Sequence, residues 1–157
     1  MDTKWYVAEL VMRLTVVDDP RNAVDRNLTL LRANSREEAY EKALKYGKRG
    51  EAKFVNPEGK EVRIEFRGIS DLVEATEPPE DGAELMFYRQ LNVTEERIRS
   101  LVRKREHLSA FRPPKRGSGP NFASAQILTK LEEAFGDKLR YVTVSTGSPR
   151  RQRRKAR

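Results

Sequence analysis

The first part of the chain carries an apolar side chain at every second position. Every even position from Tyr6 to Val16 is apolar, whereas the charges of Glu9 and Arg13 fall at odd positions. A repeat of two is typical of a β-strand, whose successive side chains point to opposite faces. The pattern therefore predicts a long strand over residues 4–17 that buries its even side chains.

A second strand is predicted after a turn. Residues 18–22 read Asp-Asp-Pro-Arg-Asn, which is a composition typical of turns, and a proline there ends the hydrogen-bond ladder. In residues 26–33, the side chains of Leu28, Leu30 and Arg32 share one face. We expect the two strands to form a hairpin with a loose connection.

One helix is predicted after this hairpin. Ser35 and Glu38 have the spacing of a capping box, in which a hydroxyl and a carboxylate bind the free amides at a helix start. The apolar residues that follow at helical spacing are Ala39, Tyr40, Ala43 and Leu44. Gly47 or Gly50 is expected to end the helix in the left-handed conformation.

Further strand patterns extend to residue 91. Residues 52–55 and 61–69 flank a turn with proline and glycine, and residues 71–75 and 84–91 carry two shorter strand patterns. Short connections favour antiparallel pairing, because parallel strands need long crossovers. Residues 1–92 are therefore predicted to form a small α+β domain, with an antiparallel sheet of about five strands packed on one helix.

Residues 93–148, called the extension below, are predicted to be basic and largely helical. A first helix is expected to begin after Thr94, which is a good cap and is followed by two glutamates. The apolar stripe expected on this helix comprises Ile98, Leu101, Val102 and Leu108.

The remainder of the extension carries a linker and two further elements. Residues 111–120 are rich in Pro, Gly and Lys or Arg and form the linker, after which Asn121 or Ser124 can cap a second helix. Residues 139–146 have the pattern of a strand. Residues 149–157, called the tail, hold six cations and are expected to be disordered.

Charge is divided unequally along the chain. Residues 1–92 contain 15 Lys or Arg against 18 Asp or Glu, and residues 93–157 contain 17 against 6. Such an excess of cations favours a polyanion, because Lys and Arg bind phosphates and release their counterions. The predicted partner is the backbone of DNA or RNA without sequence preference, and its predicted contacts are Arg97, Arg99, Arg103, Lys104, Arg105, Lys115, Arg116, Arg150, Arg151, Arg153, Arg154, Lys155 and Arg157.

Two other interpretations of these cations stay open. An acidic protein would bind the same side chains, which would make the chain an interaction module, for instance a subunit or an immunity-type protein of a bacterial assembly. Alternatively, the tail serves only to keep the protein in solution. The sequence leaves the oligomeric state open as well.

Composition excludes several classes of site. Without cysteine the chain has no disulfide, thiolate metal site or cysteine nucleophile. Its apolar run over residues 5–17 is interrupted by two charges and is shorter than the ~20 residues that span a membrane. No secretory signal is visible at the start. We expect a cytoplasmic protein with no membrane partner, cofactor or bound metal.

The sequence predicts no enzyme active site. His107 is the single histidine and lies among cations, where a surface position on a helix is expected. Glu51 and Lys53 have the E-x-K spacing of some metal-dependent nucleases, which would also need an earlier acid such as Asp25. Because short combinations of Glu and Lys arise easily by chance in so charged a chain, the nuclease is a minor alternative.

Three segments carry a family resemblance. They are the opening Trp5-Tyr6-Val7-Ala8-Glu9-Leu10, the helix entrance at residues 32–39, and the strand that ends in Phe66-Arg67-Gly68-Ile69. Together they resemble a family of small uncharacterised bacterial domains, over about residues 4–91. The resemblance implies a single α+β unit, and it brings no activity, ligand or catalytic residue.

Overall fold

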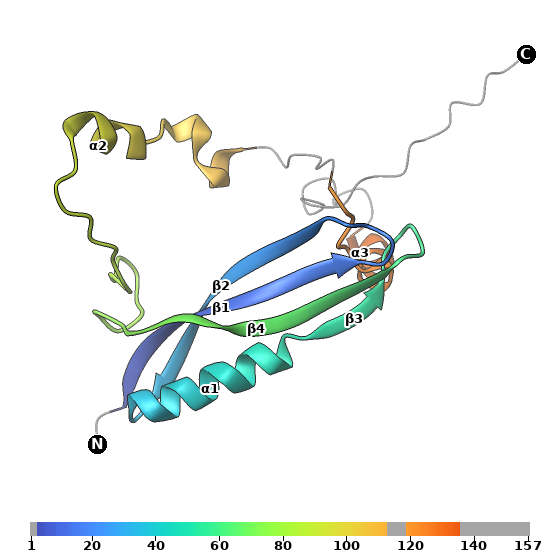
Figure 1. The fold of residues 1–157 in the computed structure, drawn as a ribbon, viewed down its shortest axis with the longest axis horizontal. Coiled ribbons are helices and arrows are strands. Elements are labelled where there is room, and N and C mark those ends of the chain that lie inside the picture. Colours follow the sequence, from blue (N-terminus) through green and yellow to red (C-terminus); the bar gives the residue numbers. More distant parts are fainter. Residues whose placement is uncertain (1–2, 113–118, 136–157) are drawn as a thin grey trace, which may run out of the picture.

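The computed structural model describes residues 3–112 and 119–135, and it is an α+β fold built on one antiparallel sheet. The sheet has four strands in the order β2-β1-β4-β3. The strands are β1 (Lys4–Val16), β2 (Asn22–Ala33), β3 (Ala52–Val55) and β4 (Glu61–Glu74). Figure 1 shows the sheet as a curled ribbon with the helix α1 (Arg36–Arg49) along one face. The predicted α+β class, with an antiparallel sheet packed on a helix, is confirmed.

The prediction of five strands is wrong for the described residues. Residues 71–74 continue β4 instead of forming a strand of their own. Residues 84–91 do not pair in the sheet, although their side chains alternate. Alternation alone does not supply a partner strand, and most side chains of this segment, Phe87, Tyr88 and Leu91 among them, are exposed. The backbone amide of Thr76 donates to the carbonyl of Leu85, and Tyr88 reaches the sheet face that α1 leaves uncovered, called the back face.

The central strand β1 buries its even positions, as predicted. Tyr6, Ala8, Leu10, Met12, Leu14 and Val16 are all buried. The strand pairs with β2 and β4 along almost its whole length, and two register irregularities interrupt the β4 pairing, between Glu9 and Leu10 and between Val11 and Met12. Bulges of this kind increase twist, which accounts for the curl of so long a strand.

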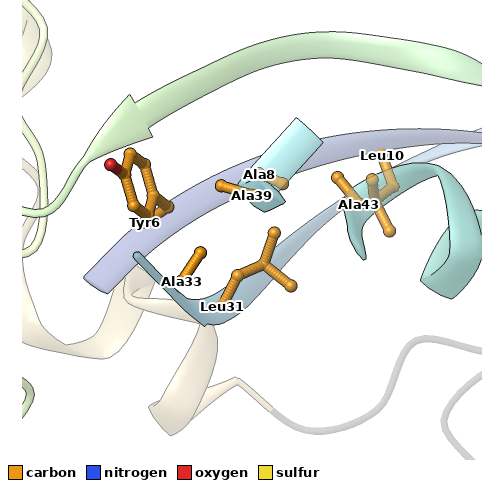
Figure 2. Close-up of a cluster of buried hydrophobic side chains, with 7 residues drawn as sticks. All are labelled: Tyr6, Ala8, Leu10, Leu31, Ala33, Ala39 and Ala43. Atoms are coloured by element: carbon orange, nitrogen blue, oxygen red, sulfur yellow. The ribbon is translucent and has the colours of Figure 1, made fainter. Parts of the chain in front are cut away.

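The main core lies between the sheet and α1. Figure 2 shows Ala39 and Ala43 of α1 directly over Ala8 and Leu10 of β1, with Leu31 beside them from β2. The alanines have no bulk beyond Cβ, so the helix can approach the strands closely. Leu31 is almost fully buried, and a buried leucine contributes about 1.5–3 kcal/mol of stability.

The ends of α1 follow the sequence only partly. The Ser35 hydroxyl accepts a hydrogen bond from the Glu38 amide at 3.1 Å, as in a capping box, but the Glu38 carboxylate accepts from the amide of Asn34 at 2.8 Å. At the other end the predicted left-handed glycine is wrong. Gly50 is right-handed, with a φ of −78°, and its amide donates to the carbonyls of Tyr46 and Gly47.

A second contact joins residues 119–135 to the far end of the sheet. Asn56, which opens the β3–β4 turn, is 1% exposed, and its Nδ2 donates to the carbonyl of Asn121 at 2.9 Å. Its Oδ1 accepts from the amides of Glu58 and Lys60. The helix α3 (Ala125–Phe135) then begins at the predicted cap, since the Ser124 hydroxyl accepts from the Ile127 amide. Figure 1 shows α3 beside the β3–β4 end of the sheet.

The predicted basic helix of the extension is not confirmed. The helix α2 runs only from Glu95 to Leu101, and the backbone is extended at Val102, with a ψ of 131°. Two 3₁₀ turns follow, η1 (Arg105–His107) and η2 (Ser109–Phe111). An amphipathic helix gains most of its stability from packing its apolar stripe, and that stripe is exposed here.

Two other expectations concern parts of the chain beyond the described ranges. The predicted strand at residues 139–146 and the tail at 149–157 both lie outside the described residues. The division of the chain at residues 92 and 148 stays a prediction. Within the part that the structure describes, no helix combines the length and the apolar character needed to cross a membrane.

Candidate nucleic-acid interface

Two of the predicted phosphate contacts lie on α2. The hydroxyl of Thr94 accepts from the Arg97 amide at 3.3 Å and so fixes the start of the helix. The guanidinium of Arg97 donates to the Ser100 hydroxyl, and Arg99 pairs with Glu95 one turn earlier at 3.3 Å. Exposed pairs of this kind contribute only about 0.3–0.5 kcal/mol, so a phosphate can displace the glutamate at little cost.

Three further predicted contacts follow α2, two of them outside any helix and the third at the start of the 3₁₀ turn η1. Arg103, Lys104 and Arg105 are all exposed. The guanidinium of Arg105 stacks over the ring of Phe111, with its carbon 4.1 Å from the ring centre. Within the described residues, Arg103 and Lys104 have no acidic partner within ion-pair distance. The sequence predicts these three side chains around a single helix, whereas in the structure they follow the end of that helix.

The exposure of this segment is continuous. Every residue from Thr94 to Arg112 is exposed, and the segment holds six Lys or Arg against three Glu. His107 is also exposed, as predicted, but it lies in a 3₁₀ turn. The other predicted phosphate contacts, which lie outside the described residues, are Lys115, Arg116, Arg150, Arg151, Arg153, Arg154, Lys155 and Arg157.

The same segment exposes apolar side chains, a feature that the sequence did not predict. The stripe expected to be buried is open to solvent, and Phe111 is exposed with it. The exposed apolar residues of the segment are Ile98, Leu101, Val102, Leu108 and Phe111. Exposed apolar clusters rimmed by charges are typical of protein-binding surfaces, so this chemistry differs from that of a purely electrostatic phosphate site.

Glu51 and Lys53, the residues of the minor nuclease alternative, bind different partners. Glu51 accepts from Lys48 at 2.9 Å and from the Phe66 amide at 3.2 Å, and these bonds lower the pKa of its carboxyl. Lys53 pairs instead with Glu61 at 2.9 Å, and that bond, with a second from Arg63, lowers the pKa of Glu61. In the described ranges, no three acidic or histidine side chains gather as a metal site would require.

Asp25 borders a cleft beside α1. The cleft has a volume of about 330 Å³ and lies where α1 ends and the sheet continues. Leu10, Met12 and Ile64 line it, and Asp25 stands on its β2 side together with Asn27. The cleft therefore combines an apolar lining with a polar rim on the edge strand.

The back face carries a buried carboxylate that the sequence pattern does not predict. Glu9 shares its parity with Arg13 and was expected on the exposed side of β1, but it is 4% exposed. Its carboxylate pairs with Arg26 of β2, and Tyr88 donates to it at 3.4 Å. Buried carboxylates need such partners. The available signal is the apolar residues on either side of it, from Tyr6 to Ala8 and from Leu10 to Met12.

The sequence and the fold were compared with known proteins. A family model described as a domain of unknown function (DUF4288) matches residues 5–87, which is more than half of the chain. This match covers the sheet and α1 and stops before the extension. No curated protein and no solved structure matches.

Proposed function

The chain belongs to the family of the domain of unknown function DUF4288, whose description assigns no activity, and from the chain's own charge and geometry we propose that it is a non-enzymatic accessory protein of nucleic acid. It contacts the phosphate backbone through its residues beyond 92. The α+β domain, which carries a slight excess of acids, docks the protein to its assembly.

The observation that carries this proposal is the continuous exposure of a basic segment. Every side chain of residues 94–112 is exposed, so their cations are accessible to a phosphate backbone. Guanidinium groups suit this role, because each forms paired hydrogen bonds with phosphate oxygens and stays charged. The cationic excess beyond residue 92 supplies the remaining affinity by counterion release.

Recognition of this kind reads the backbone and not the bases. Phosphate contacts fix position and orientation but carry no sequence information. The specificity of the assembly then comes from the docking partner of the α+β domain or from the shape of the nucleic acid. DNA and RNA differ in groove width and in the 2′-hydroxyl, so competition between duplexes of the two kinds separates them.

We predict that the affinity for duplex DNA falls steeply with salt and that the slope depends on the extension and tail. Each lost phosphate contact flattens the slope of log K against log salt by about 0.9. The triple change Arg103→Gln, Lys104→Gln, Arg105→Gln should therefore flatten it by up to ~2.7, and ending the chain at Gly147 by up to ~5. Fluorescence anisotropy over a salt series measures these slopes.

A matched control removes three cations from the α+β domain. Lys45, Arg36 and Arg67 are all exposed, and changing each to glutamine removes the same charge without touching the extension. The control should leave the slope unchanged within error. Equal slopes for the full chain, the triple variant and the shortened chain would contradict the proposal.

A second candidate function is favoured by the exposed apolar residues of the extension. Their side chains lie on either side of the cations at 103–105, which suits a segment that folds against an acidic protein with an apolar groove. The protein is then an interaction module, such as a subunit or an immunity-type protein.

Affinity capture after nuclease treatment distinguishes the two candidates. The interaction module should retain a stoichiometric partner, and changing Ile98 and Leu101 to aspartate should release it, because a buried carboxylate in the groove costs several kcal/mol. The matched control is Val55→Asp, an exposed valine on the sheet. A partner lost with the nuclease treatment would support the nucleic-acid proposal instead.

A further inference from the structure

The strand β2 forms an open edge of the sheet. It is 12 residues long and pairs only with β1. Edge strands offer unpaired amides and carbonyls to other strands, and proteins usually shorten, charge or cover such edges. At the opposite edge β3 has only 4 residues and pairs only with residues 61–64 of β4. The rest of β4 is interrupted by two register irregularities, so β2 is the long edge with a regular register.

Two hydrogen bonds show which residues of β2 point their backbone groups outward. Lys42 of α1 donates to the carbonyl of Arg32 at 2.7 Å, so that carbonyl does not face β1. Trp5 is the register partner of Arg32, and its carbonyl accepts a hydrogen bond from the amide of Ala75 on the β4 side. Because antiparallel pairs alternate, the even residues of β2 present their amides and carbonyls to the outside.

The side chains of these outward residues are largely apolar. Val24 is 57% exposed, Leu28 is 62% exposed and Leu30 is 38% exposed, all on the back face of the sheet. The charge of Arg26 between them is neutralised within the chain by the carboxylate of Glu9. Among the described residues, Lys42 alone occupies the outer edge, and it does so at one end, leaving Asn22–Leu31 open.

We propose that β2 pairs antiparallel with β2 of a second copy of this chain, about a twofold axis at Asn27. The pairing continues the two sheets into one of eight strands. Residues 24, 26, 28 and 30 of each copy then form roughly eight intermolecular backbone hydrogen bonds. The inference stands apart from the proposed function, since it uses no residue of the extension.

The axis position follows from the residues that come to face one another. About Asn27, the apolar Val24 faces Leu30 and the acid Asp25 faces the hydroxyl of Thr29. Moving the axis to Arg26, Thr29 or Asp25 opposes two arginines or two aspartates, which destabilises cross-strand pairs. An axis at Leu28 sets the carboxylate of Asp25 against an apolar leucine.

The arrangement of α1 agrees with this axis. The helix packs on the Leu31 and Ala33 end of β2, so an axis at Asn27 carries the two helices to opposite ends of the joined strands. The strand region next to the axis carries the rim of the cleft, which includes Asn27. A strand therefore approaches this part of the edge without meeting either helix.

The first test is a disulfide at the axis. The chain has no cysteine, so Asn27→Cys provides a single thiol in each copy. Asn27 lies on the inward parity of β2, so at the axis it forms a non-hydrogen-bonded pair with Cα atoms about 4.5 Å apart, a separation that a disulfide bridges without strain. Non-reducing electrophoresis after mild oxidation should show a covalent dimer as the main product.

Two single-cysteine controls test the register of the pairing and the choice of β2 as the pairing edge. In the proposed register, position 28 faces Arg26 of the other copy, so Leu28→Cys should give little covalent dimer. Val55→Cys, at an exposed site on β3, should also give little. Crosslinking of Leu28→Cys in preference to Asn27→Cys would overturn the proposed axis. Equal crosslinking at position 55 would overturn the proposal, because it would indicate random collision.

The second test measures association of the unmodified chain. Sedimentation equilibrium should show a concentration-dependent dimer. The double change Leu28→Lys, Leu30→Lys should raise the dissociation constant of this dimer by at least about tenfold. The control Val55→Lys should leave the dissociation constant unchanged, and circular dichroism checks that each variant is folded. A monomer at all concentrations used for NMR, or a dimer untouched by the lysines, would overturn the proposal.

Discussion

Replacing Gly47 by alanine should lower the free energy of unfolding by about 1–3 kcal/mol. In most helix interiors the same change stabilises by about 0.5–1 kcal/mol, because alanine loses less chain entropy than glycine. Here the new Cβ would fall inside the ring of Phe66, in contact with its Cε2, Cδ2 and Cζ atoms. The ring is half-buried against the main core, so moving it aside loosens that packing. Urea denaturation measures the change.

Two further variants identify the ring as the cause. Gly50→Ala lies at the end of the same helix and meets the flexible end of Met12 and one carbonyl at 3.3 Å, so its expected cost is less than about 1 kcal/mol. Adding Phe66→Leu to Gly47→Ala should recover part of the loss, as a coupling between the two sites. A stabilising effect of Gly47→Ala would contradict the close approach of Gly47 to the Phe66 ring.

Replacing Asn56 by alanine should cost about 2–4 kcal/mol. The change removes the acceptor for two amides of the β3–β4 turn and the donor to the buried carbonyl of Asn121. Buried groups left without a partner pay their full cost of desolvation. The matched control is Asn22→Ala, an exposed residue at the start of β2, which should change stability by less than about 0.5 kcal/mol.

Asn56→Asp separates the turn from the contact with residues 119–135. The carboxylate still accepts from the two turn amides, but it cannot donate to Asn121 and repels that carbonyl instead. We expect hydrogen exchange to become much faster at the amides of Ile127 and Leu128, which donate to Ser124, while the β1 amides stay protected. Unchanged exchange at these amides would show that residues 119–135 are held by other contacts.

Local patterns in the sequence predicted much of the fold. The even side of β1, the turn at Asn56 and the cap at Ser124 each depend on neighbouring residues alone, and all three are confirmed. The burial of Glu9 was not predictable in this way, because it depends on Tyr88, which is 79 positions away. The number of strands was wrong for the same reason, since a partner strand is a non-local property.

The candidate interface was predictable in composition but not in shape. The excess of cations beyond residue 92 is visible in the sequence, and so is the apolar stripe from Ile98 to Leu108. The sequence does not say whether that stripe has a surface to pack on. Without one, α2 ends at Leu101, and Arg103 and its neighbours leave the helix face on which they were expected.

The contact between Asn56 and residue 121 has a consequence for how this protein can diverge. Asn56 binds the main-chain carbonyl of its partner and no side-chain atom of it. The requirement for an amide side chain at this joint thus falls on the domain, whereas position 121 needs only a carbonyl in the right place and a side chain that fits a buried site. A substitution at 121 that keeps this size and backbone conformation therefore preserves the joint, while one at Asn56 does not.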